Sequence, residues 1–267
     1  MNTTFPDRQL LLKFIPLILA VIILIIWGVE TPPGLLGKTD AVGYAVCHRI
    51  SERSFFIEDR PISLCARCTG MYMGALLALI YQSRFRKHGG LPGKPVLAIL
   101  AIFLVAFGID GVNSYMHFFP SLPSLYNPNN TLRLITGTGV GLGMAALIYP
   151  IFNQTLYMDW KEERVISSVK EMMVIILISA GLIGLVLLQV PIILYPLAVL
   201  SSATVLILLS MIYIIVWTML LKQENKYTTL REAWWLITAG FGTALLQIAL
   251  MDFARYQFTG SWAGFVL

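Results

Sequence analysis

The sequence predicts an all-α integral membrane protein, a polytopic helical bundle that crosses the bilayer about seven times. Hydrophobic residues make up 57% of its 267 residues and charged residues only 12%, whereas soluble domains carry about 25% charged residues. The mean hydropathy of +0.77 and several long apolar runs indicate the same class. We therefore expect one transmembrane domain over residues 1–267, in the cell membrane and surrounded by membrane lipids.

Seven stretches have the length of about 20 mostly apolar residues that a bilayer core requires. The first resembles the start of a secretory signal peptide. It is too long for one and no small-x-small cleavage site follows, so we expect a retained span. The second is the least apolar, because CARCTG forms its first turns. The stretches are residues 10–28, 64–82, 95–118, 132–153, 171–190, 194–221 and 233–256.

Basic residues between the spans predict the orientation. With a cytoplasmic amino terminus, the inside segments carry twelve basic residues, starting with Arg8, and the outside segments carry six. Because cytoplasmic loops are enriched in Lys and Arg, this orientation is favoured. The same placement gives the net charge of +5 a role in orienting helices, so nucleic acid is not an expected partner. The first loop is an exception, because it carries five of the six outside cations. A local role for its arginines and simple solvation of a long loop explain these cations equally well.

One short polar stretch, residues 47–70, contains all three cysteines and is called the cysteine stretch below. Cys65 and Cys68 are three residues apart at the start of a helix expected to begin near Ser63, so they share one helix face. The helix amino terminus favours their thiolate forms. Cys47 and His48 lie upstream, within reach of a folded loop. Three sulfurs and one imidazole would complete a tetrahedral zinc shell.

Other interpretations of the cysteines remain open. Cys47 and His48 are neighbours, and neighbouring residues on a helix diverge by about 100°, so both can face one ion only on a non-helical backbone. A disulfide between Cys65 and Cys68, with no cofactor, is the alternative outside the cytoplasm. Packing as small apolar residues is the third.

Three arginines accompany the cysteines and predict a binding site for an anion. Arg49, Arg53 and Arg67 occur in or next to the cysteine stretch. Guanidinium groups bind phosphate and carboxylate groups with paired hydrogen bonds. A lipid headgroup or another anion is therefore a candidate ligand.

Polar residues inside the spans form a second candidate site. Asp110, Asn113 and His117 recur at i, i+3 and i+7 and so share one face of the third span. Arg133 and Thr136 lie in the first turns of the fourth. In an antiparallel pair Arg133 could reach Asp110, which would make both charges tolerable. These two residues are the candidate catalytic groups, with a buried structural salt bridge as the alternative.

The glycine-rich run GTGVGLG lies inside the fourth span, at residues 137–143. No GK[ST] follows, so a phosphate-binding loop is not indicated. Stripes of small residues allow membrane helices to approach closely. The run therefore predicts close packing against another helix.

The cysteine stretch also carries a family resemblance. The string C-H-R-x3-R-S-F, followed by P-x3-C-x-R-C-T-G-x-Y-x-G, occupies positions from Cys47 to Gly74. It resembles domain of unknown function 2085, a family of uncharacterised prokaryotic membrane proteins. The resemblance implies a membrane location and importance of this block, extends to about residue 150, and implies no activity.

Together these features divide the chain. Residues 29–63 are expected to form an extracytoplasmic loop with the Cys and His residues, in which residues 41–56 could form a short amphipathic helix. Residues 64–153 are expected to form the core helices that resemble the family. Residues 171–256 are expected to add three helices.

Three functions compete. The first is a metal site, with zinc as the expected ion, of structural or binding role in a scaffold or in a subunit of a membrane complex, because closed Cys-rich shells are usually structural. The second is a metal- or thiol-dependent enzyme acting on a lipid or another membrane-borne substrate at the outer leaflet. The third is a small transporter, supported only by the Asp110 face. The sequence does not decide whether the protein is an enzyme.

Overall fold

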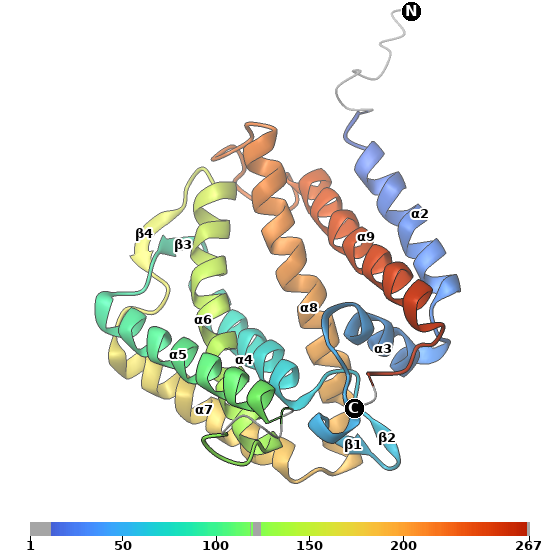
Figure 1. Ribbon diagram of the computed structural model, residues 1–267. Coiled ribbons are helices and arrows are strands. Elements are labelled where there is room, and N and C mark those ends of the chain that lie inside the picture. Colours follow the sequence, from blue (N-terminus) through green and yellow to red (C-terminus); the bar gives the residue numbers. More distant parts are fainter. Residues whose placement is uncertain (1–11, 118, 120–123, 266–267) are drawn as a thin grey trace, which may run out of the picture.

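The computed structural model describes residues 12–117, 119 and 124–265. Arg8 and the first two residues of the first predicted span lie outside this range. Within it the chain forms eight α-helices and two pairs of short strands (Figure 1). The helices are α2 (Ile15–Glu30), α3 (Gly34–Val46), α4 (Ala66–Ser83), α5 (Lys94–Met116), α6 (Asn130–Leu156), α7 (Val169–Leu187), α8 (Pro191–Leu220) and α9 (Trp234–Thr259).

The all-helical membrane class is confirmed, and the count of seven spans is not. Each predicted stretch coincides with a helix. Among the described residues, the five helices α5 to α9 are long and apolar enough to cross a membrane. The pair α2 and α3 qualifies together as a sixth span, bent by 106°. Helix α4 has polar residues at both ends and falls short of the same criterion.

The sharp bend between α2 and α3 follows from local sequence. Pro32 and Pro33 have no N–H to continue the hydrogen bonds of α2. Gly34, the next residue, has a φ of 78°, in the left-handed region that glycine adopts readily. The chain therefore turns back and α3 packs against α8 and α9.

The amphipathic helix predicted over residues 41–56 has the wrong bounds. The helix ends at Val46, and the backbone at Cys47 is extended. A single 3-10 turn (Ser51–Arg53) follows, and then a hairpin of β1 (Phe56–Ile57) and β2 (Arg60–Pro61).

Helices α4 and α6 form the centre of the bundle. Their backbones touch at glycines: a Cβ at Gly141 would lie 1.9 Å from the Met71 carbonyl oxygen, and one at Gly70 would lie 2.3 Å from that of Leu134. The close packing predicted for the glycine run of α6 is thus confirmed. Helices α5 and α7 lie on one side of this pair, and α8, α9 and α2 follow on the other (Figure 1).

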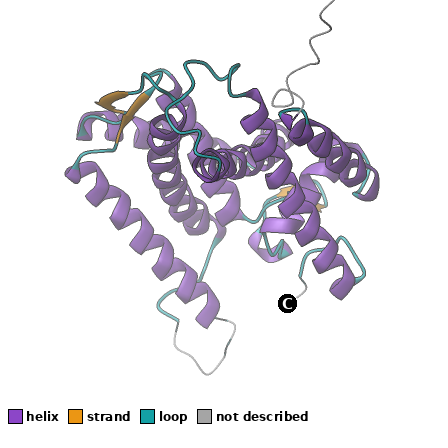
Figure 2. Cartoon of the chain, turned by 90° about the horizontal axis from the view of Figure 1, so that it is seen from above, coloured by secondary structure: helices purple, strands orange, loops and turns teal. Residues whose placement is uncertain are grey.

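The bundle has two distinct ends. At one, which we call the strand end, β3 (His88–Gly90) pairs with β4 (Lys161–Arg164), and the Met158 N–H donates to the Tyr227 carbonyl at 2.9 Å. These contacts hold the α4–α5, α6–α7 and α8–α9 loops together at this end of the bundle. Seen from above, the β3–β4 pair lies at the edge of the bundle (Figure 2). The opposite end, which we call the cysteine end, contains α3, the β1–β2 hairpin and the last turns of α9 (Figure 1).

Candidate metal centre

Three cysteine sulfurs meet at the cysteine end. The Sγ atoms of Cys47, Cys65 and Cys68 all lie within 4.8 Å of one another. Cys47 and Cys65 are buried and Cys68 is half-buried. Sulfur ligands of a tetrahedral zinc ion, each about 2.3 Å from the metal, lie about 3.8 Å apart. The three sulfurs are therefore spaced closely enough to share one ion after small side-chain adjustments.

The local backbone explains how the sulfurs come together. Helix α4 begins at Ala66, not near Ser63 as predicted, so Cys65 is its N-cap residue and has an extended backbone. The Cys65 N–H donates to Cys47 Sγ at 3.3 Å, and the Arg49 N–H donates to the same sulfur at 3.5 Å. Hydrogen bonds to a thiolate stabilise its charge and orient it as a ligand.

The electrostatics of Cys47 also favour a cation. The pKa of Cys47 is held well below its usual value, first because the Cys65 thiol and then because the Cys68 thiol donates a hydrogen bond to it. Burial opposes this effect, and His48 adds to it. Cys47 is thus the sulfur of the group that carries negative charge most readily. Binding of one divalent cation by all three sulfurs would require the loss of the Cys65 and Cys68 thiol protons.

His48 lies outside the three-sulfur group. Its Nδ1 accepts a hydrogen bond from the Ile50 N–H at 3.3 Å, and its carbonyl oxygen accepts one from the Phe265 N–H at 3.1 Å. The backbone at Cys47 is extended rather than helical, so the expected helical divergence does not apply, and a place for His48 in the metal shell stays a prediction. Of the four predicted ligands, the structure brings together three.

Arg255 of α9 holds the backbone of this site. Its Nη1 donates to the carbonyl oxygens of Tyr44 and Cys47, both at 2.7 Å, and its Nη2 donates to that of His48 at 3.3 Å. The guanidinium also lies 4.0 Å from the centroid of the Tyr44 ring. Sequence reasoning did not assign Arg255 to this site. The available signal was an arginine inside the last span, where a charged group needs a partner.

The three arginines predicted to bind an anion all interact within the chain. Arg49 is buried and forms an ion pair with Asp40 at 3.0 Å. Arg53 donates to the Ser114 carbonyl oxygen at 3.1 Å. Arg67 pairs with the acidic residue of α5. Each guanidinium thus already has a hydrogen-bond or ion-pair partner within the chain. Anion binding by these residues stays a prediction.

The predicted ion pair between Asp110 and Arg133 is wrong. Asp110 is 1% exposed and forms its ion pair with Arg67 of α4. Its other oxygen accepts a hydrogen bond from the Tyr126 hydroxyl at 2.9 Å. Arg133 instead donates to Asn130 Oδ1 at 2.9 Å in its own helix. Because both oxygens of Asp110 are bound, the pair resembles a buried structural salt bridge.

The remaining polar residues of that face do not form one cluster. Asn113 is buried beside Asp110, and its Nδ2 donates to the Tyr126 carbonyl oxygen at 2.9 Å. His117 follows the last residue of α5 and is exposed. Thr136 bonds a carbonyl oxygen of its own helix at 2.9 Å. The transporter interpretation, which rests on the Asp110 face alone, stays a prediction.

Comparison with known proteins places the cysteines in a recognised segment. Residues 47–147 match the model of the family DUF2085, described as a predicted membrane protein. An uncharacterized protein of Methanocaldococcus jannaschii is 33% identical over 123 residues, which cover 45% of this chain and 72% of that protein. An uncharacterized protein of Methanothermobacter thermautotrophicus is 34% identical over 102 residues, covering 38% of this chain and 83% of that protein. No solved structure matches the chain significantly.

Proposed function

Because the chain belongs to the DUF2085 family of predicted membrane proteins, we propose that its three cysteines form a structural metal centre. The ion is zinc, and the centre fastens the segment between α3 and α4 to the helix bundle. The observation that carries this proposal is the meeting of three Sγ atoms within 4.8 Å from two separate parts of the chain. The protein then acts as a scaffold, or as a subunit of a membrane complex, among lipids.

The donor set supports zinc. Thiolates are soft ligands that select zinc, copper(I) or iron–sulfur clusters over hard cations. The three sulfurs fill three of the four places in a tetrahedral zinc shell. His48, next to Cys47, or a water molecule would fill the fourth. Copper(I) is the competing ion for a shell of three sulfurs alone.

The surroundings support a structural role. The site joins the end of α3 to the first turn of α4, and Arg255 ties it to the last turns of α9. Cys47 is 7% exposed and Cys65 is 2% exposed. An ion held by these buried sulfurs would cross-link the three segments. Burial of the sulfurs limits the access of a substrate to that ion.

We place the cysteine end outside the cytoplasm and the amino terminus inside. The placement is supported by eleven basic residues of the described chain at or next to the strand end, where the Phe14 and Trp234 ring centroids lie 5.1 Å apart. They are Lys13, Arg84, Arg86, Lys87, Lys94, Lys161, Arg164, Lys170, Lys222, Lys226 and Arg231. Since basic loops remain in the cytoplasm, the strand end faces inward. An impermeant thiol reagent tests this when labelling is compared with that of wild type: Asp59→Cys should add labelling on intact cells, and Glu162→Cys should add labelling only after lysis.

A second candidate function is a metal- or thiol-dependent enzyme acting on a membrane-borne substrate. One observation favours it: a cavity of about 450 Å³ lies beside the sulfur cluster, lined in part by Cys47, His48, Arg255 and Phe258. A substrate in this cavity would lie beside Cys47, one of the three residues that would hold the ion. Catalytic metal sites keep one coordination position open.

Serine substitution of each cysteine separates the two functions. A structural centre predicts that Cys47→Ser, Cys65→Ser and Cys68→Ser each lose bound zinc and melt at lower temperature. Ser83→Ala, at the far end of α4, is the control and should retain both properties. An enzyme predicts that the variants keep their stability and lose a metal-dependent turnover of lipid. Wild-type protein without metal and with a Cys65–Cys68 disulfide, as shown by mass spectrometry, would contradict both metal-based functions.

A further inference from the structure

A second cavity lies between α2 and α9 at the cysteine end. Its volume is about 540 Å³, and aliphatic side chains, four aromatic rings and two carboxylates line it. The charged and aromatic residues are Trp27 and Glu30 of α2, Asp252, Phe253 and Tyr256 of α9, and Trp262 beyond α9. The three cysteines are not among the lining residues, so this cavity is separate from the metal centre.

Asp252 gives this cavity an unsatisfied negative group. Its side chain is 3% exposed, and its Oδ2 accepts a hydrogen bond from Trp27 Nε1 at 3.0 Å. Its Oδ1 has no hydrogen-bond partner among the described residues. A buried carboxylate oxygen without a partner is costly, and a bound ligand that donates to it or carries positive charge would remove that cost. Glu30, at the exposed rim, adds a second negative charge.

The basic residues nearby are directed to other partners. Arg255 donates through its Nη atoms to carbonyl oxygens next to the metal centre. Arg49 pairs with Asp40. Lys38 lies 5.9 Å from the centroid of the Trp27 ring and donates to the Thr31 carbonyl oxygen at 3.0 Å. None of these cations forms an ion pair with a carboxylate of the cavity within the described chain, and the lining itself carries only negative charge.

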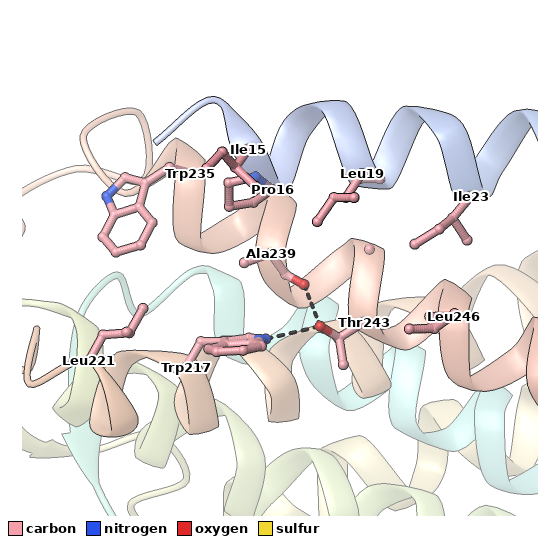
Figure 3. A pocket seen from close by; sticks show the side chains of 12 residues that line it. Ile15, Pro16, Leu19, Ile23, Trp217, Leu221, Trp235, Ala239, Thr243 and Leu246 are labelled. Atoms are coloured by element: carbon pink, nitrogen blue, oxygen red, sulfur yellow. Dashed lines mark hydrogen bonds between the residues drawn. The ribbon is translucent and has the colours of Figure 1, made fainter. Parts of the chain in front are cut away.

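Another cavity, lined by α2, α9 and the end of α8, shows the contrast. It lies toward the strand end and is drawn in Figure 3, with a volume of about 340 Å³ and no charged residue in its lining. Trp217 Nε1 donates to Thr243 Oγ1 at 2.9 Å and that hydroxyl donates to the Ala239 carbonyl at 2.8 Å, whereas the neutral Trp235 Nε1 has no hydrogen-bond partner among the described residues. That cavity suits an acyl chain, whereas the one at Asp252 has a charged group without a complete set of partners.

We propose that the cavity between α2 and α9 binds an amphipathic organic cation. The ammonium group lies against Asp252 and the aromatic rings, which attract a cation through their negative faces. The apolar chain extends along Ile23 and Leu246, which also line the cavity. Phe253 is 64% exposed on the outer surface of α9, so the ligand enters from the bilayer. A lipid with an ammonium headgroup and a free lipophilic amine share this chemistry.

The test uses the full-length protein in nanodiscs of phosphatidylglycerol, which has no ammonium group. Octyltrimethylammonium is titrated by isothermal calorimetry, with octyl glucoside as the uncharged probe of equal chain length. Wild-type protein should bind the ammonium probe at least tenfold more tightly than the glucoside. Asp252→Asn keeps an acceptor for Trp27 but removes the charge, and should weaken binding of the ammonium probe about tenfold. Equal binding of both probes to wild type, or unchanged binding to Asp252→Asn, overturns the proposal.

Two further variants keep the test valid if Asp252→Asn does not fold. Glu30→Gln, at the exposed rim, should weaken binding of the ammonium probe about threefold. Glu163→Gln, an exposed carboxylate at the strand end, is the matched control and should bind like wild type. Unchanged binding to Glu30→Gln in a chain whose Asp252 variant is misfolded counts against the proposal. Competition then identifies the source: free choline displaces the probe if the site takes soluble amines, and phosphatidylcholine added to the nanodiscs displaces it if the site takes lipid.

Discussion

Arg255 Nη1 lies 2.7 Å from the carbonyl oxygen of Cys47, although 208 residues separate the two in sequence. Cys47 begins the segment that matches the family model, residues 47–147, and Arg255 lies well beyond its end. The last helix of the bundle therefore positions the first cysteine of the candidate metal centre. At least one helix outside the family segment, α9, therefore contacts the backbone of the cysteine segment directly.

Arg255→Lys should weaken zinc binding without removing a ligand. One ammonium group cannot reproduce a guanidinium that bonds three carbonyl oxygens and stacks on Tyr44. Loss of such a supporting group typically costs about tenfold or more in metal affinity. Competition with a chromophoric chelator measures the affinity, and Arg231→Lys, an exposed residue at the strand end, is the control. An affinity equal to that of wild type would show that α9 does not support the centre.

Gly141→Ala should destabilise the bundle by about 2 kcal/mol or more, because the new Cβ would overlap the backbone of α4 and force two packed helices apart. Gly184→Ala on α7 is the matched control, since nothing lies within 4 Å of a Cβ at that position. The control should be neutral or more stable by up to about 1 kcal/mol, as expected when alanine replaces glycine in a helix. Unfolding in mixed micelles measures both. Equal effects at the two positions would mean that α4 and α6 are not in close contact.

Arg67 and Asp110 should behave as one unit. Arg67→Met leaves the buried Asp110 carboxylate without its charged partner, and Asp110→Leu leaves the half-buried Arg67 guanidinium without its own. Each loss costs up to about 3 kcal/mol. The double variant leaves neither charge, so its loss should be smaller than the sum of the single losses by about 2 kcal/mol. A double-mutant cycle of unfolding free energies measures this coupling. Strictly additive losses would contradict the ion pair.

Helix positions could be predicted from the sequence because apolar runs of bilayer length are a local signal. Helix α3 could not, since its glycines and polar residues give no clear periodicity and its start depends on the turn at Pro32 and Pro33. Close packing of α6 against another helix could be anticipated from its small residues, but not that the partner is α4. The number of spans depends on how α2, α3 and α4 meet the bilayer, which hydropathy does not decide.

Partners in the candidate sites were harder to predict because they depend on distant contacts. Asp110 was expected to pair with Arg133, the nearest cation along an antiparallel helix pair. The glycine contact between α4 and α6 brings Arg67 to it instead. The cysteine spacing predicted a shared site, and the three sulfurs do meet there, but whether His48 completes the shell depends on side-chain geometry that spacing does not give.

Zinc-edge X-ray absorption on protein purified in mild detergent tests the metal centre most directly. We predict bound zinc with three sulfur neighbours at about 2.3 Å and one nitrogen or oxygen neighbour. A shell of oxygen and nitrogen alone, or protein that contains no metal and has a Cys65–Cys68 disulfide, would contradict this prediction.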